Sequence, residues 1–167
     1  MGAGARDLGE CFIDGTLVGP TRGAKRGHDQ RGQGTRLMAV VDRMGLPLAV
    51  HTASASPPEV PLVPDTLAAS STPERLIGDQ AYGSDPLDVA PAAIGIERIA
   101  LHRAHRKPPN TQDGRPFRRY KRRWKVARRF AWRQYFRRVL VRPAYQAETF
   151  LGCVHLGYNL MLLRCYV

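Results

Sequence analysis

The sequence predicts a single α/β domain in which a mixed sheet of five strands is flanked by helices. First, five short apolar runs rich in strand-forming residues are separated by turn signals. Second, the later runs alternate with helical patterns, as expected where crossovers join parallel strands. Third, the chain has 167 residues, of which 43% are hydrophobic. This length and composition suit one ordinary domain with its own core.

The first half of the chain predicts three antiparallel strands. Residues 10–18 are rich in aromatic and branched apolar side chains, and the Gly-Pro pair at 19–20 ends the run. Two further apolar runs, 35–42 and 46–53, are separated by a short turn, which predicts a hairpin. The glycine-rich, basic segment 19–34 predicts a mobile loop between the first two strands.

The middle of the chain predicts alternating helices and strands. Residues 59–70 have a partly helical pattern, although prolines weaken its first turn. Residues 75–79 predict a short buried strand that ends in an acid. Residues 84–94 predict a helix that Ser84 or Asp85 would cap, and residues 94–101 predict the fifth strand.

The C-terminal third predicts a loop and two helices. Residues 102–116 are basic and rich in Pro and Gly, as is typical of a loop. Residues 118–138 contain neither Gly nor Pro and predict one long helix, and residues 146–165 predict the last helix. The first helix is expected to pack against the core with Trp124, Ala127, Ala131 and Tyr135. The last helix is expected to do so with Phe150, Val154, Leu160 and Leu163.

The positive charge is concentrated in one segment. The chain carries a formal charge of +12. Residues 98–142 hold 17 Lys and Arg and a single acid, Asp113, which makes +16, whereas residues 1–97 hold 8 basic and 12 acidic residues, which makes −4. A polyanion is the expected partner, and nucleic acid is the commonest polyanion. The alternative interpretation is a solvated basic face without a partner.

Several classes of protein are excluded. No apolar run approaches the roughly 18 residues that a membrane helix needs. The first 25 residues lack the apolar stretch of a secretory signal. Cys11, Cys153 and Cys165 form neither a CxxC pair nor a metal-binding spacing, so we expect no disulfide framework and a reducing, cytoplasmic location.

Two acids stand at strand positions that suit metal-dependent chemistry. Asp14 lies in the first predicted strand, and Asp79 ends the fourth. If these strands are neighbours, the two carboxylates meet at one edge of the sheet and repel each other unless a cation neutralises them. Mg²⁺ is the usual cation, and a pair of such ions supports in-line phosphoryl displacement. The alternative is that both acids only improve solubility.

Five blocks follow one another along the chain: CFIDGT, KRGHDQRGQGTRLMAVVD, LPLAVHTASASPPEV, ERLIGDQAYGSDPLD and TQDGRPFRRYKRRWKVARRFAW. In this order they resemble the DDE-type transposases of bacterial insertion sequences, in particular the group named for insertion sequences four and five. The resemblance runs from about Glu10 to Leu163. It implies a ribonuclease-H-like fold, which agrees with the predicted order of elements.

The resemblance also implies which residues form the site. The family's first two catalytic acids lie in blocks similar to Phe-Ile-Asp-Gly and Gly-Asp-x-Ala-Tyr, which correspond to Asp14 and Asp79 here. Both would hold metal.

The third acid belongs to a spaced signature on the long helix: Tyr, two residues, Arg, three residues, Glu, six residues, Lys. Tyr120 and Arg123 match this signature, whereas Ala127 replaces the Glu and Gln134 replaces the Lys. A metal ligand is therefore lost at Ala127.

The implied activity is Mg²⁺-dependent nicking and strand transfer of DNA, impaired by Ala127. The expected partners are the DNA of the element ends and of the target, and self-association on DNA is a further option. Trp124 and Trp132 are expected either to pack in the core or to stack on a flipped base. The residues expected to contact DNA are Lys107, Arg119, Tyr120, Arg122, Arg123, Lys125 and Arg128.

Residues 1–9 are interpreted as a short leader and residues 10–167 as the catalytic domain, without the N-terminal DNA-binding domain of the family. The expected location is the bacterial cytoplasm, at the nucleoid when bound to DNA. Two alternatives remain open, a non-catalytic basic DNA-binding remnant and an unselected pseudogene product.

Overall fold

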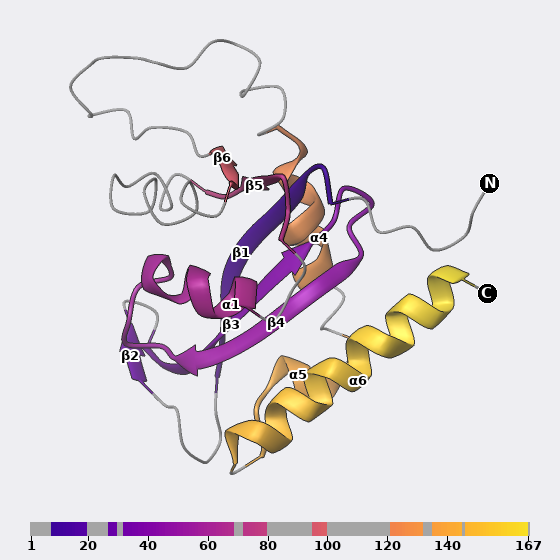
Figure 1. Ribbon diagram of the computed structural model, residues 1–167. Coiled ribbons are helices and arrows are strands. Elements are labelled where there is room, and N and C mark those ends of the chain that lie inside the picture. The colour runs from indigo at the N-terminus through magenta and orange to yellow at the C-terminus, as the bar shows by residue number, and fades with distance from the viewer. Residues whose placement is uncertain are drawn as a thin grey trace.

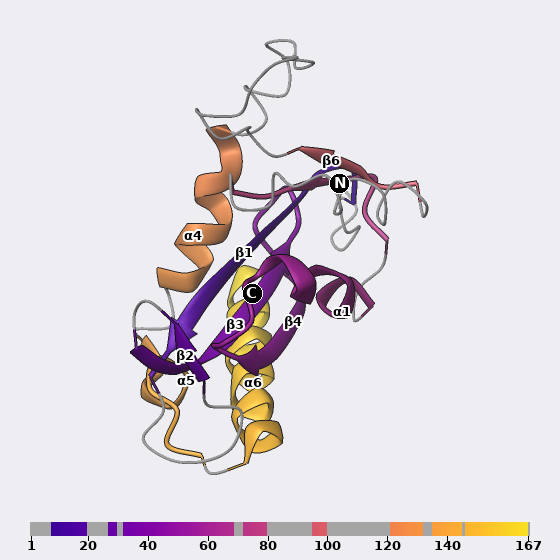
Figure 2. The same cartoon turned by 90° about the vertical axis from the view of Figure 1, so that its left-hand side faces the viewer.

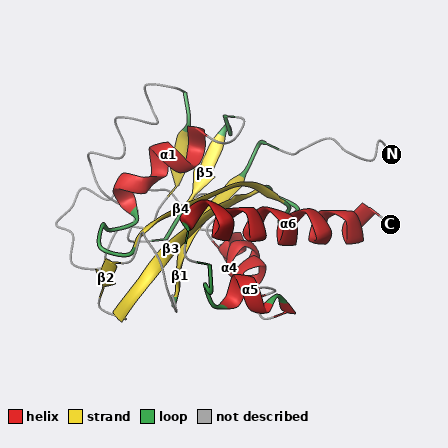
Figure 3. Cartoon of the chain, turned by 90° about the horizontal axis from the view of Figure 1, so that it is seen from below, coloured by secondary structure: helices red, strands yellow, loops and turns green. Residues whose placement is uncertain are grey.

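A mixed sheet lies between two groups of helices in the computed structural model (Figure 1). The structure describes residues 8–19, 27–29, 32–68, 72–79, 95–99, 121–131, 135–144 and 146–166. One helix, α1, covers one face of the sheet, and α4 and α6 cover the other, as the view from below shows (Figure 3). This arrangement confirms the predicted α/β class, a mixed sheet flanked by helices.

The first three long strands form an antiparallel meander. Strand β1 (Cys11–Val18) pairs with β3 (Gly32–Val41), which pairs on its other side with β4 (Pro47–Ser54). The β3–β4 turn is held by Asp42, whose side-chain Oδ1 accepts a hydrogen bond from the Leu46 backbone N–H at 2.7 Å. Gly45 has a φ of 82°, a left-handed conformation that glycine adopts without strain. The predicted hairpin is therefore confirmed.

Two short strands extend the sheet in parallel. Strand β5 (Arg75–Ile77) pairs with β1, and β6 (Glu97–Ile99) pairs with β5, both in the parallel sense. All five predicted strands are thus present as β1, β3, β4, β5 and β6. The predicted helix 84–94 and loop 102–116, which would follow β5 and β6, lie outside the described residues.

A sixth strand lies where the sequence predicts only a loop. Strand β2 (Gly27–Asp29) pairs with the start of β3, with Gly27 opposite Gly34. The loop prediction for residues 19–34 is wrong over this part, because strand pairing uses backbone groups that glycine also carries. A Cβ atom at Gly34 would lie 2.4 Å from Leu17 Cδ1, so this glycine permits a close approach of β3 to β1.

The predicted helix 59–70 is a 3₁₀ turn, η1 (Val60–Leu62), followed by α1 (Val63–Ala68). The last predicted helix is confirmed as α6 (Ala147–Tyr166). None of the helices in the described segments is long and apolar enough to cross a membrane.

The single long helix predicted over 118–138 is wrong. The described part of this region consists of a 3₁₀ turn, η3 (Lys121–Arg123), followed by α4 (Trp124–Ala131) and the separate short helix α5 (Arg137–Leu140). Phe136 has an extended backbone, with φ −122° and ψ 94°, and packs against the core cluster. Tertiary packing at Phe136 therefore overrides the helical propensity of the segment.

The core forms two clusters, one on each face of the sheet. Side chains alternate along a strand, so Phe12 joins the cluster under α4 and α6, whereas Ile13 joins the cluster under α1. The same alternation places Leu37 on the α4 face and Met38 on the α1 face.

The core face predicted for the helix 118–138 is wrong. Trp124 is 54% exposed and Tyr135 is 76% exposed, and Ala127 and Ala131 are also exposed. Instead, Val126 and Phe130, one turn apart, pack against the sheet. The sequence pattern predicted a helix here but not which of its faces packs against the sheet.

In α6 the prediction is confirmed for its first half only. Phe150 and Val154 are buried, whereas Leu160 and Leu163 are exposed. Tyr158 is buried and Met161 packs against the same core cluster, so Leu160 and Leu163 lie on the outer face of α6. Figure 1 shows how α6 runs along the sheet.

Candidate functional site

Asp14 lies within β1, and Asp79 lies two residues after the end of β5, the strand that pairs with β1 in parallel. Phe12 of β1 is paired in parallel with Ile77 of β5, and each aspartate stands two residues further along its strand direction. Since side chains two residues apart in a strand point to the same face, Asp14 lies on the face that carries Phe12. Asp79 is placed on the same side by its ion pair with Arg123, which directly precedes α4. That is the face covered by α4 (Figure 2).

The arginine of the spaced signature reaches this pair of acids. Arg123 ends η3, directly before α4, and its Nη1 lies 3.2 Å from Asp79 Oδ2. The side chains are 31% and 42% exposed, respectively, so the ion pair is open to solvent. Tyr120, the other matching residue of the signature, lies outside the described residues.

Burial raises the pKa of Asp14 to about 6. Two effects act in the opposite direction and lower this pKa: the hydrogen bond that the Gly15 backbone N–H donates to Asp14 Oδ1 at 2.9 Å, and the positive charge of Arg123. The negative charges of Glu59 and Asp79 add to the effect of burial and raise the pKa further. Asp14, Asp79 and Arg123 therefore form one electrostatic cluster. A carboxyl group with a strongly raised pKa in such a cluster is typical of functional sites.

A second ion pair lies beneath the site on the opposite face of the sheet. Arg36 Nη1 contacts Glu59 Oε1 at 2.8 Å, and Arg36 Nη2 donates to the Ala55 backbone oxygen at 3.0 Å. A Cβ atom at Gly15 would lie 2.5 Å from Glu59 Cδ, so the absence of a side chain there makes room for this carboxyl group.

Sequence reasoning missed the ion pair between Arg36 and Glu59. The available signal was the charge of Arg36 inside an apolar strand run, because a buried arginine requires a partner of opposite charge.

Ala127 stands one helical turn after Arg123 on α4 and is exposed. Residues four apart share a helix face, so position 127 lies on the side from which Arg123 reaches Asp79. A methyl group there provides no ligand.

The acids that the structure describes around this site do not fit a pair of divalent ions. No group of three His, Cys, Asp or Glu side chains that could hold a metal occurs within the described ranges. Two carboxylates remain, and Asp79 is already paired with Arg123. Glu148 lies in the first turn of α6, and Asp113 lies outside the described part of the chain.

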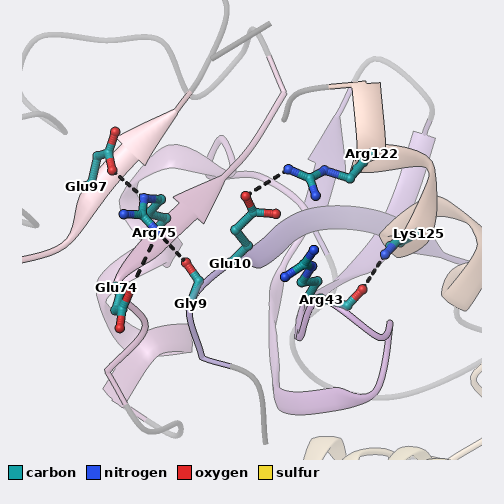
Figure 4. Close-up of polar contacts among 8 residues, drawn as sticks. All are labelled: Gly9, Glu10, Arg43, Glu74, Arg75, Glu97, Arg122 and Lys125. Carbon is teal, nitrogen blue, oxygen red and sulfur yellow. Dashed lines mark hydrogen bonds and ion pairs between the residues drawn. The ribbon is translucent and has the colours of Figure 1, made fainter. Parts of the chain in front are cut away.

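Two of the basic residues expected to contact DNA fix η3 and α4 to the sheet (Figure 4). Arg122 Nη2 donates to Glu10 Oε1 at 2.8 Å, and Lys125 Nζ donates to the backbone oxygen of Arg43 in the β3–β4 turn. Glu10 is buried at the start of β1. These contacts set the position of Arg123 between them.

Figure 4 also shows the contacts of Arg75, which hold the parallel strands of the sheet together. Arg75 Nε of β5 contacts Glu97 Oε2 of β6 at 2.6 Å, and Arg75 Nη1 donates to the Gly9 backbone oxygen at 3.3 Å. This arginine therefore ties β5 to both of its neighbouring segments.

Arg128 stacks over Trp124 on the outer side of α4, with its Cζ 5.6 Å from the ring centre. The exposure of Trp124 contradicts the prediction that it packs in the core. Base stacking by this residue stays a prediction. Trp132, Lys107, Arg119 and Gln134 lie outside the described residues.

Comparison with known protein families identifies the domain. A family model described as "Transposase DDE domain" matches residues 6–160. The chain belongs to this family. No curated protein matches the chain with significance.

Two solved structures share the fold of this transposase domain. One is a piggyBac transposase synaptic complex with hairpin DNA, which has a TM-score of 0.62, 10% identity and coverage of 90% of this chain and 45% of that chain. The other is a simian T-cell lymphotropic virus intasome in complex with the PP2A regulatory subunit B56 gamma, which has a TM-score of 0.53, 14% identity and coverage of 89% and 47%. The chain therefore spans about half the length of these neighbours.

Proposed function

We propose that this chain is a transposase domain of the insertion-sequence type that binds DNA through the basic η3–α4 region and is impaired in DNA cleavage. The observation that carries the proposal is the convergence of Asp14, Asp79 and Arg123 at the end of the parallel strand pair. In a chain of the DDE family, these positions match the first two acids and the arginine of the motifs described above.

DNA is the proposed partner. The charge of +16 over residues 98–142 supports this, because a polyanion relieves the repulsion within the segment. Arg123 and Arg128 lie in the half-exposed or exposed part of η3 and α4, where a phosphate can approach. The piggyBac neighbour is itself a complex with hairpin DNA.

Cleavage in this family is proposed to need divalent metal, with Mg²⁺ the first candidate. Asp14 and Asp79 would be the residues to hold such an ion, which would supply Lewis-acid assistance to phosphoryl transfer. With Asp14 and Asp79 as the available acids and alanine at position 127, we expect weak metal binding and nicking near background.

A binding assay tests the central claim. The purified chain is titrated into fluorescently labelled duplex DNA in EDTA, and anisotropy is measured between about 50 and 200 mM salt. We expect affinity to fall with salt at a slope near −0.9 per neutralised phosphate and to depend little on sequence. Binding that is absent at about 50 mM salt, or indifferent to salt, would refute the proposal.

The two alternative interpretations of the chain predict different results in assays of DNA binding, DNA nicking and unfolding. A non-catalytic DNA-binding remnant binds DNA with the same salt dependence but does not nick it even when an acid is restored at position 127. An unselected pseudogene product shows no cooperative unfolding transition in urea.

A further inference from the structure

We propose that Arg123 alternates between two anionic partners, the Asp79 carboxylate in the free domain and a DNA phosphate in the complex, so that Asp79 sets the DNA affinity of the domain. This inference rests on the DNA-binding function proposed above and adds a regulatory role for the acid. Asp79 then competes with DNA for the Arg123 guanidinium.

The ion pair between Arg123 and Asp79 is suited to exchange. Its distance is 3.2 Å, and its side chains are 31% and 42% exposed. Ion pairs at this level of exposure are weak because water screens them. A phosphate accepts two parallel hydrogen bonds from a guanidinium, which is a stronger arrangement than a single solvent-exposed contact.

The backbone on both sides of Arg123 is held in place. Arg122 is bound to Glu10, which is buried in the sheet, and Lys125 is bound to the backbone oxygen of Arg43. Only the Arg123 side chain therefore has to move between the two anions. A helix start anchored in this way presents the guanidinium to either partner without refolding.

The charges around Arg123 determine how its exchange between Asp79 and phosphate affects DNA binding. Asp14 and Asp79 place two carboxyl groups at the end of the pairing between β1 and β5, and their negative charge repels phosphate. When Arg123 pairs with Asp79, it offsets one of these charges but offers less to DNA. A DNA phosphate that takes two parallel hydrogen bonds from the Arg123 guanidinium therefore competes with Asp79 for the Nη1 group.

A double-mutant cycle tests the inference in EDTA, with duplex DNA as the probe. The four chains are the parent, Asp79→Asn, Arg123→Ala and the double variant. We expect Asp79→Asn to tighten binding about two- to fivefold in the parent background, which is the strength of an exposed ion pair. The salt slope should become steeper by up to about 0.9, because one more cation is available to phosphate.

The same Asp79→Asn change should alter affinity much less when Arg123 is absent. Two controls separate this coupling from general electrostatics: Asp65→Asn, which removes an exposed charge on α1, and Arg128→Ala, which removes a neighbouring cation on α4. Asp79→Asn should tighten binding equally in the Arg128→Ala and parent backgrounds.

Three results would overturn the inference. Equal tightening with and without Arg123 means that Asp79 acts by simple repulsion of phosphate. No change on Asp79→Asn means that the two anions do not compete. Absence of DNA binding in all chains at about 50 mM salt refutes the proposed function itself, and this inference falls with it. An Arg123→Lys chain that reproduces the parent coupling would show that charge alone, without the guanidinium fork, is sufficient for the exchange.

Discussion

Replacing Asp14 with Asn is expected to stabilise the domain at neutral pH. Asn has nearly the same shape, and its side-chain oxygen can still accept the hydrogen bond that Gly15 donates to Asp14 at 2.9 Å. The substitution therefore removes mainly the charge, and this charge is held in a buried environment that disfavours it.

The magnitude follows from the pKa of Asp14, which burial raises from 3.8 to about 6. A shift of about two units corresponds to a penalty of roughly 3 kcal/mol on the ionised folded state. Below about pH 4 the carboxyl group is protonated in both states and costs nothing. As pH rises from about 4 to 6, the unfolded chain releases the proton first, so the folded state loses stability, and above pH 6 the full penalty remains.

Urea unfolding of the parent and Asp14→Asn chains at pH 4 and pH 7, in EDTA, measures this directly. We expect a gain of about 2–3 kcal/mol in the free energy of unfolding at pH 7 and only about 0.5 kcal/mol at pH 4, where the unfolded carboxyl group is already partly ionised. Glu74→Gln is the control, because its side chain is 70% exposed and should change stability by less than about 0.5 kcal/mol. A gain that is the same at both pH values, or a loss at pH 7, would refute the reasoning.

Ala127→Glu is expected to raise both Mg²⁺ affinity, measured by calorimetry, and Mg²⁺-dependent DNA nicking, at little cost in stability because Ala and Glu both favour helix. Glu59→Ala is expected to lower the free energy of unfolding by about 3 kcal/mol in urea, since it removes the partner of the buried Arg36. Gly34→Ala is expected to lower it by about 1–3 kcal/mol, because the new methyl group meets Leu17 at 2.4 Å.

Each of these three predictions can be contradicted by experiment. An Ala127→Glu chain that binds Mg²⁺ no better than the parent places position 127 away from the aspartates. If it binds the ion but does not nick, a further part of the transposase machinery limits activity. A neutral Glu59→Ala chain means that Arg36 finds another partner, and a neutral Gly34→Ala chain means that Leu17 moves aside.

The strands were predictable because their patterns are local. Phe12 and Ile13 stand in an apolar run between turn signals, and period-two alternation sends them to opposite faces of the sheet, as the structure shows. The positions of Asp14 and Asp79 followed from the same runs, once motifs in the sequence suggested that their strands are neighbours.

The remaining features depend on contacts between distant residues. The break after α4 is set by Phe136, which packs on the core and is invisible to a search for Gly and Pro. The ion pair of Arg36 and Glu59 joins positions 23 residues apart. No periodicity reports such a pair, and the rotation of α4 likewise depends on which apolar residues the sheet can accept.

The brevity of β5 has a consequence for the lifetime of the acid pair. Asp79 is held beside Asp14 by a strand of three residues, which pairs with β1 over Leu76 and Ile77. Segments with few paired backbone groups open locally at a lower free energy than the whole domain unfolds. The amides of the three-residue β5 should therefore exchange with deuterium faster than those of β3, which is paired from Thr35 to Val41 with both β1 and β4. Each local opening of β5 would carry Asp79 away from Asp14, and each closing would bring the two acids together again.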